Sequence, residues 1–141
     1  MSQLRAKPTD GIVVFEKQPY WGPELKRQAS AQSVFVRECR SVHDLIPAAD
    51  ELMTAVIVIV LDAAPVDCLA WLARQVHSQS PLNIVVIASS ELSDLEWSIR
   101  ESGAAAFVHD EIPGHHLAQI CLRILRKTSS TRARVAAPTV R

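Results

Sequence analysis

The segment Thr54-Ala55-Val56-Ile57-Val58-Ile59-Val60-Leu61-Asp62 is an uninterrupted apolar run, rich in β-branched side chains, that one carboxylate closes. A strand that is apolar on both faces must be covered on both faces, so this run predicts a buried parallel strand between two layers of helices. It is too short to cross a bilayer. Since open α/β folds bind ligands at the carboxyl ends of their strands, Asp62 lies where a site is expected.

Similar apolar runs alternate along the chain with segments of helical period, the pattern of strand–helix units around a parallel sheet. Five strands are predicted, at residues 11–15, 34–36, 54–61, 83–88 and 104–108. The predicted fold class is therefore α/β, a doubly wound parallel sheet of the flavodoxin-like kind.

Helix signals follow each of these strands. We expect the first helix to begin near Glu24 and the second, near Ser41, to be short, kinked or delayed because of Pro47. Pro65 suits the first turn of a third helix, and the box Ser93-Asp94-Leu95-Glu96 suits the start of a fourth, ended by Gly103. The stripe of the last helix is Leu117, Ile120, Cys121, Ile124 and Leu125.

The chain of 141 residues is long enough for one domain, which we place at residues 11–127. Residues 1–10 are expected to be a flexible N-terminal segment and residues 128–141, with three Arg and no acid, a disordered basic tail. Fifteen acidic and fifteen basic side chains cancel, so we expect no nucleic acid to bind the core domain.

Cysteines and the N-terminus indicate the compartment. Cys39, Cys68 and Cys121 are odd in number and widely spaced, so they are interpreted as reduced packing residues rather than disulfides or zinc ligands. No apolar stretch follows the first charges of the chain. We therefore expect a cytoplasmic protein without a signal peptide, a membrane anchor or a membrane partner.

Polar residues follow four of the predicted strands: Glu16-Lys17, Asp62, Ala88-Ser89 and Asp110. Together with residues 103–110, GAAAFVHD, this arrangement resembles the receiver domain of bacterial response regulators, the CheY-like family of two-component signal transduction, over about residues 11–127. The last segment matches the family's Gly-Ala-x-x-aromatic-aliphatic-x-Lys pattern without a gap. The resemblance implies the strand order 2-1-3-4-5.

The resemblance also implies roles for single positions. Asp62 matches the phosphoacceptor and Glu16 the first of two metal-binding acids, but Lys17 stands where the second acid belongs. Asp110 stands where the family has its Lys, and the switch hydroxyl position falls on Ala88. The resemblance also implies switch positions at Ser89, which follows Ala88 by one residue, and at Phe107, the aromatic residue of the pattern.

The exchanged charges predict an acidic pocket made by Glu16, Asp62 and Asp110 with Lys17 as an internal cation in place of Mg²⁺. The alternative is that Lys17 points into water from a loop. Phosphoryl transfer needs a divalent cation and a fixed ammonium, so Mg²⁺-dependent phosphorylation of Asp62 is not expected.

Aromatic and histidine residues offer further candidates. Tyr20 and Trp21, in the loop after the first strand, either form a binding patch or cover the end of the sheet. Trp71 and Trp97 are expected to be partly buried at the edges of their helices. The pair His115-His116 is expected to be solvated, since neighbouring helix residues diverge by about 100°. Four isolated glycines make no phosphate-binding loop.

These observations favour a degenerate receiver, or pseudo-receiver, that signals by protein contact and is neither an enzyme nor a carrier of a cofactor or metal. By analogy, the fourth helix, fifth strand and fifth helix are its candidate interface, and a homodimer is compatible with this interpretation. Two alternatives stay open: a phosphorylatable receiver that uses Asp62, and a flavodoxin-like small-molecule binder covered by the Tyr20-Trp21 loop.

Overall fold

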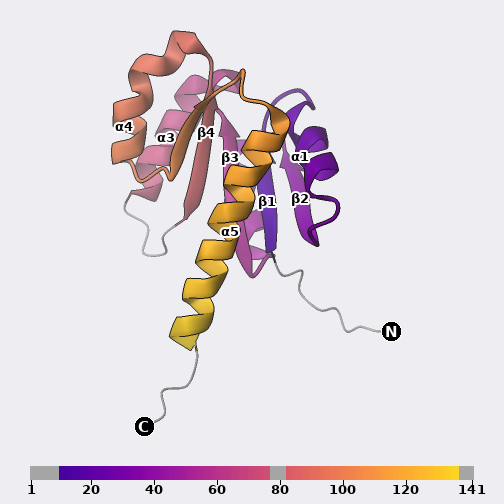
Figure 1. Ribbon diagram of the computed structural model, residues 1–141. Coiled ribbons are helices and arrows are strands. Elements are labelled where there is room, and N and C mark those ends of the chain that lie inside the picture. Colours follow the sequence, from indigo (N-terminus) through magenta and orange to yellow (C-terminus); the bar gives the residue numbers. More distant parts are fainter. Residues whose placement is uncertain (1–9, 77–81, 137–141) are drawn as a thin grey trace.

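The computed structural model describes residues 10–76 and 82–136, with side chains as far as residue 131 (Figure 1). Five parallel strands form one sheet in the order β2-β1-β3-β4-β5. The strands are β1 (Asp10–Phe15), β2 (Val34–Cys39), β3 (Thr54–Val60), β4 (Asn83–Ala88) and β5 (Ala106–His109). The α-helices are α1 (Trp21–Ala29), α2 (Leu45–Asp50), α3 (Pro65–Gln75), α4 (Glu96–Glu101) and α5 (Gly114–Ala136). The short 3₁₀ helices are η1 (Val42–Asp44), η2 (Leu61–Ala63) and η3 (Ser90–Leu95).

The helices cover both faces of the sheet, as the apolar strands require. Helices α1 and α5 lie on one face, and α2, α3 and α4 lie on the other (Figure 1). Successive side chains of a strand point to opposite faces. In β1, for example, Val13 and Phe15 pack with the α2–α4 layer, whereas Ile12 and Val14 pack with α1 and α5. The predicted fold class and strand order are confirmed.

Most of the predicted elements are present, with shifted ends. The fourth strand has the predicted bounds, Pro65 is the first residue of α3, and Gly103, at a φ of 100°, follows the end of α4. Helix α2 is short and begins only at Leu45, after η1, so Pro47 falls in its first turn, where its missing N–H has no partner to lose.

Two helix starts differ from the prediction. Helix α1 begins at Trp21, three residues before Glu24. The predicted capping box is not formed, because Ser93 lies inside η3 and no side chain caps the start of α4 at Leu95. In both places the path of the chain as it leaves the sheet, and not the local signal for a helix start, determines where the helix begins.

The last helix is longer than expected. Helix α5 continues through Thr128 to Ala136, so the prediction of a disordered tail from residue 128 is wrong for that stretch, and residues 137–141 and 1–9 lie outside the described residues. The prediction stopped where the apolar stripe stops. Polar contacts take over there, since Thr128 accepts a hydrogen bond from Asn83 (3.0 Å) and Ser129 donates to Asp10 (3.4 Å). In the described part of the chain, no helix has the length and hydropathy needed to span a membrane.

Burial of the tryptophans departs from the expectation in both directions. Trp71 is 3% exposed and belongs to the core under α3, whereas Trp97 is 72% exposed on α4. Cys39, Cys68 and Cys121 are free and buried, and burial raises the pKa of the Cys68 and Cys121 thiols to about 12. These cysteines are packing residues, as predicted.

Candidate functional site

Glu16 is the only carboxylate within the buried core of the described residues, and it is bound to the start of helix α1. Its carboxylate accepts hydrogen bonds from three consecutive backbone N–H groups, those of Tyr20 (3.1 Å), Trp21 (2.9 Å) and Gly22 (2.9 Å). The first N–H groups of a helix lack partners within the helix and carry the positive end of its dipole. The Glu16 carboxylate therefore replaces the N-cap side chain that Tyr20 does not supply.

The alternation of strand side chains explains this role. Phe15 points into the α2–α4 layer, so the next residue, Glu16, is directed to the opposite face, where α1 begins. The anchor at Glu16 also explains why α1 starts at Trp21 rather than near Glu24. Both oxygens of the residue that matches the family's first metal-binding acid are thereby used for structure.

Asp62 is exposed at the end of β3, in η2, and binds the end of β4. Ser89 donates to the Asp62 carboxylate twice, from its backbone N–H to Oδ1 (2.7 Å) and from its hydroxyl to Oδ2 (2.6 Å). The strand register places these two residues at one level, since Val60 is paired with Ile87 and each lies two residues earlier.

This geometry corrects the expected position of the switch hydroxyl. Ala88 is fully buried in β4, and its methyl side chain cannot donate a hydrogen bond. Ser89, in contrast, donates its hydroxyl to the Asp62 carboxylate. A hydroxyl group therefore lies at this end of β4, one residue after the position that the resemblance implies. Phe107, the aromatic of the pattern, is 7% exposed in β5 and packs in the α2–α4 layer.

The predicted acidic pocket does not come together around Lys17. The exposed Lys17 ammonium lies over the Phe15 ring, 5.8 Å from its centroid, and among the described residues no ion pair includes it. Asp110 is exposed, and its backbone N–H extends the sheet by donating to the Ala88 carbonyl (3.0 Å). Within residues 10–76 and 82–131, no three His, Cys, Asp or Glu side chains are grouped to hold a metal ion.

Only one of the two residues of the predicted aromatic patch is exposed. Tyr20 is 64% exposed, but Trp21 is 5% exposed and packs in the core between α1 and α5. The two rings meet edge to face, with centroids 4.8 Å apart. Burial of Trp21 leaves Tyr20 as the exposed part of the proposed patch.

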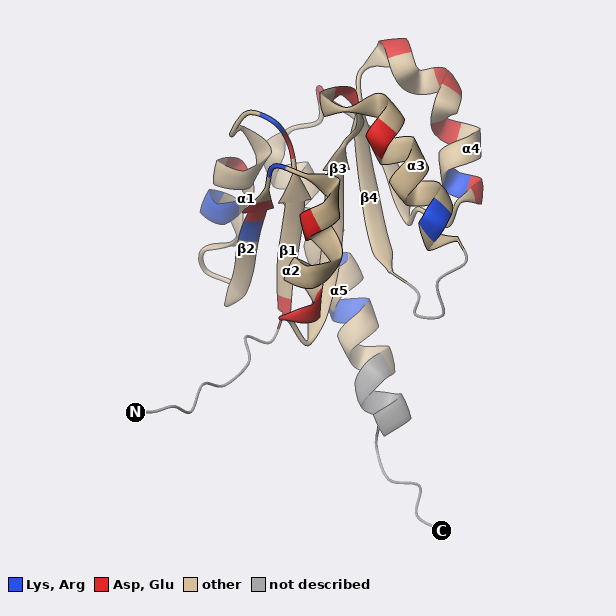
Figure 2. Ribbon diagram, turned by 180° about the vertical axis from the view of Figure 1, so that it is seen from behind, with Lys and Arg blue, Asp and Glu red and all other residues tan. Residues whose placement is uncertain are grey.

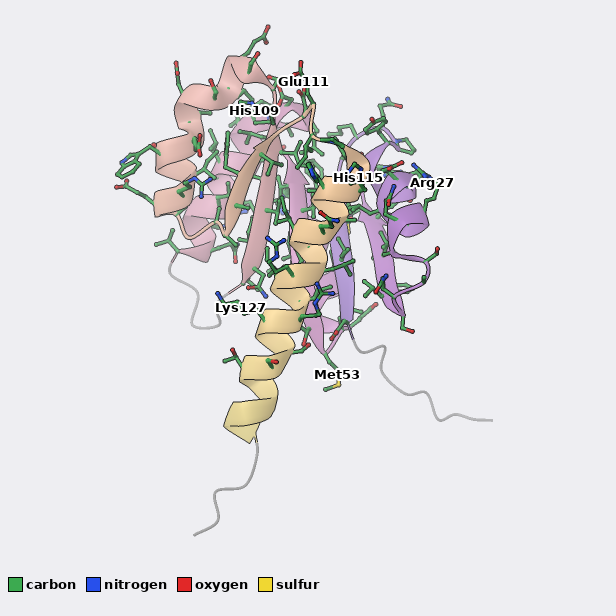
Figure 3. All side chains as sticks on the ribbon, in the orientation of Figure 1. Arg27, Met53, His109, Glu111, His115 and Lys127 are labelled. Atoms are coloured by element: carbon green, nitrogen blue, oxygen red, sulfur yellow. The ribbon has the colours of Figure 1, made fainter. Side chains whose placement is uncertain are left out.

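Histidines lie at the same end of the molecule as these aromatics. His109 is the last residue of β5, Glu111 lies on the segment between β5 and α5, and His115 lies in the first turn of α5 (Figure 3). His115 and His116 are both exposed, as predicted, and their ring centroids are 4.7 Å apart.

A charged cluster that the sequence did not reveal joins α1 to β2. Glu38 accepts from Lys26 (2.9 Å) and from Arg40 (2.9 Å), and these two hydrogen bonds hold the pKa of Glu38 below its usual range. The side chain of Glu38 also fills the space above Gly22, where a Cβ would approach its Cδ to 2.4 Å. The sequence did not reveal the contact with α1, because Glu38 is far from Gly22 and Lys26 along the chain.

Comparisons with solved structures identify the fold. The signal receiver domain of a putative LuxO repressor protein from Vibrio parahaemolyticus superposes with a TM-score of 0.74 at 13% identity, over 91% of this chain and 98% of that one. The signal receiver domain of an HD domain-containing protein from Pseudomonas fluorescens Pf-5 gives 0.70 at 13%, over 95% and 98%. The chain has the receiver-domain fold.

A longer protein has the same fold in part. Full-length FixJ from B. japonicum matches with a TM-score of 0.70 at 17% identity, over 83% of this chain and 58% of FixJ. No protein-family model and no curated protein sequence matches the chain. Identities this low show a shared fold and no more. The activity must therefore be argued from the residues of the site.

Proposed function

We propose that this chain is an atypical receiver domain that signals by contact with a protein partner, without Mg²⁺-dependent phosphorylation of Asp62. The observation that carries the proposal is the hydrogen bonding of Glu16, whose two carboxylate oxygens already accept three N–H groups of α1. A metal ion at this corner would compete with these N–H groups for the carboxylate, since only one lone pair, on Oε1, is left unused.

The remaining charges at the strand ends support the same conclusion. Phosphoryl transfer to a carboxylate relies on cations that neutralise the phosphoryl oxygens. Position 110 carries a carboxylate instead of an ammonium, and Lys17 is placed over the Phe15 ring. A phosphoryl group on Asp62 would therefore meet added negative charge and no fixed cation from β5.

The partner surface we propose includes α4, β5 and α5. Trp97 on α4 supports it, because a large exposed aromatic is a common anchor of protein interfaces. We also propose a cytoplasmic location, supported by the three free, buried thiols.

The proposal is tested by incubating the chain with acetyl phosphate and Mg²⁺ and measuring its intact mass. We expect no phosphoryl adduct on the parent chain, and none on Asp62→Asn, the matched control. An adduct that forms on the parent and is absent from Asp62→Asn would overturn the proposal.

A phosphorylatable receiver remains the second candidate because of one contact, the Ser89 hydroxyl at 2.6 Å from Asp62. In that case the hydroxyl would follow the phosphoryl group and carry the signal to β4. Ser89→Ala separates the two candidates in a cellular assay. It would abolish a phosphorylation-dependent response, whereas signalling by constitutive contact would persist.

A further inference from the structure

The net charge of zero conceals a separation of charge along the chain. All fifteen acidic residues lie at or before Glu111, together with nine basic ones, which gives that part a charge of −6. The rest of the chain, residues 112–141, contains six basic residues and no acidic one, which gives it a charge of +6. Most of this segment is helix α5 (Figure 2).

The fold fixes the direction of this helix. Leu117, Cys121 and Leu125 are buried against the sheet, so the opposite side of α5 faces solvent. Arg123, Arg126 and Lys127, spaced three and four residues apart, are all exposed and share that outer side. We call these three residues the α5 basic face.

The α5 basic face differs from most of the other described basic residues in forming no ion pair. Five of the seven described basic side chains before Glu111 are in ion pairs: Lys26, Arg27, Arg37, Arg40 and Arg100. In the described residues, none of the three cations of the α5 basic face forms one, and Figure 3 shows Lys127 extending away from the helix.

Hydroxyl groups lie next to these cations. A groove of about 550 Å³ runs along α5 beside the amino ends of β4 and β5, and its lining includes Asn83, Ala105, Ile124, Lys127, Thr128 and Thr131. Backbone phosphates are bound in proteins by Lys and Arg together with Ser, Thr and Asn side chains. The α5 basic face and this groove supply those groups side by side.

We propose that the α5 basic face binds the phosphate backbone of a nucleic acid, without reading its sequence, although the net charge of zero predicted no such partner for the core domain. An acidic protein is the competing occupant, but protein interfaces are centred on apolar or aromatic side chains. The large exposed hydrophobic residues of the described chain are Tyr20, Phe35, Met53, Val66, Val76 and Trp97, and none of them is on α5. The α5 basic face, with three exposed cations, hydroxyl groups beside them and no fully exposed large apolar side chain, fits a phosphate backbone better.

The proposal is tested by fluorescence anisotropy of the full chain with a labelled duplex DNA of about 20 base pairs. Three phosphate contacts predict that affinity falls roughly 40-fold between 50 and 200 mM salt. The triple variant Arg123→Gln, Arg126→Gln, Lys127→Gln should bind at least about ten-fold more weakly at 50 mM salt and lose most of the salt dependence. Circular dichroism verifies that the variant is folded.

A matched triple variant, Lys17→Gln, Arg37→Gln, Arg74→Gln, removes the same charge from exposed positions elsewhere and should retain the parent's affinity. Equal weakening by both triples, or no binding by the parent at 50 mM salt, would overturn the proposal. Competition by poly-glutamate as effective as competition by unlabelled duplex would assign the face to an acidic protein instead, and would overturn the nucleic-acid assignment too.

Discussion

At the scale of single residues, Glu16 and its neighbour Lys17 have different roles, although the resemblance places both at the metal-binding positions of the family. Glu16 is buried and bound to three N–H groups, whereas Lys17 is exposed, with its ammonium 5.8 Å from the centroid of the Phe15 ring. The first is a structural anchor of α1, and the second contributes little to the fold.

We predict that Glu16→Ala lowers the free energy of unfolding by about 2–3 kcal/mol, because three helix N–H groups lose a charged acceptor near the buried end of α1. Glu16→Gln, which keeps one acceptor oxygen, should cost less. Lys17→Ala should cost less than about 1 kcal/mol, the range of an exposed cation–π contact. Urea unfolding at pH 7 measures all three. A Lys17→Ala variant less stable than Glu16→Ala would contradict this division of roles.

The sequence indicated that Asp62 ends a buried strand, but it did not show which residue binds its carboxylate. Asp62 was found because a carboxylate that ends a buried strand is a local signal. The partner of Asp62 was not, because Ser89 meets it through the register of β3 and β4, and a shift of one residue decides between Ser89 and Ala88. The Glu16 anchor was missed because nothing in the sequence shows that Tyr20 leaves α1 without a cap.

At the scale of elements, the contact between α1 and β2 depends on Glu38 and its two cations, Lys26 and Arg40. The lowered pKa of Glu38 means that the folded chain holds the carboxylate charged more readily than the unfolded chain does. Its contribution is therefore complete above the ordinary glutamate pKa, and it is lost as the pH falls through the lowered pKa of the folded state.

We predict that Glu38→Gln removes part of the acid sensitivity of the fold. Between pH 7 and pH 3 the parent should lose about 0.5–1 kcal/mol more stability than the variant, a modest amount because water reaches the cluster. Glu51→Gln, which breaks the exposed pair with Arg37, is the control and should follow the parent. Parallel stability curves for the parent and Glu38→Gln would refute the proposed contribution of Glu38.

The tryptophans of helices α3 and α4 differ in burial. Trp71 is buried under α3, and Trp97 stands out from α4. Helical periodicity predicted partial burial for both, but it could not say how far each helix tilts onto the sheet, and the six-residue α4 covers much less of it than the eleven-residue α3.

We predict that acrylamide quenches the fluorescence of Trp97 and leaves Trp21 and Trp71 largely protected, because both are nearly inaccessible. Trp97→Phe should therefore remove most of the quenchable emission, whereas Trp71→Phe should not. A parent protein whose Trp97 becomes protected upon addition of a binding protein would place that partner on α4. Quenching that Trp97→Phe leaves unchanged would show that another tryptophan is accessible.

At the scale of the whole molecule, the receiver fold was predictable because each level of the sequence agrees with it. Apolar strands, helices of matching length and the closing Gly103–Asp110 segment all specify one sheet order. The charge distribution was not captured by the net charge, since its two halves cancel. The length of α5 was underestimated because its last turns are held by polar contacts, which leave no periodic pattern.

The central claim is that the strand ends of this receiver fold do not take up Mg²⁺ and a phosphoryl group. The most direct test is an NMR titration of the labelled chain with Mg²⁺ and then beryllofluoride, which imitates a phosphoryl group on a carboxylate. We predict no saturable shifts at the amides of Tyr20, Trp21 and Gly22, which Glu16 binds, or at Ser89, which is bound to Asp62. Saturable shifts at these amides, absent in Asp62→Asn, would contradict the account.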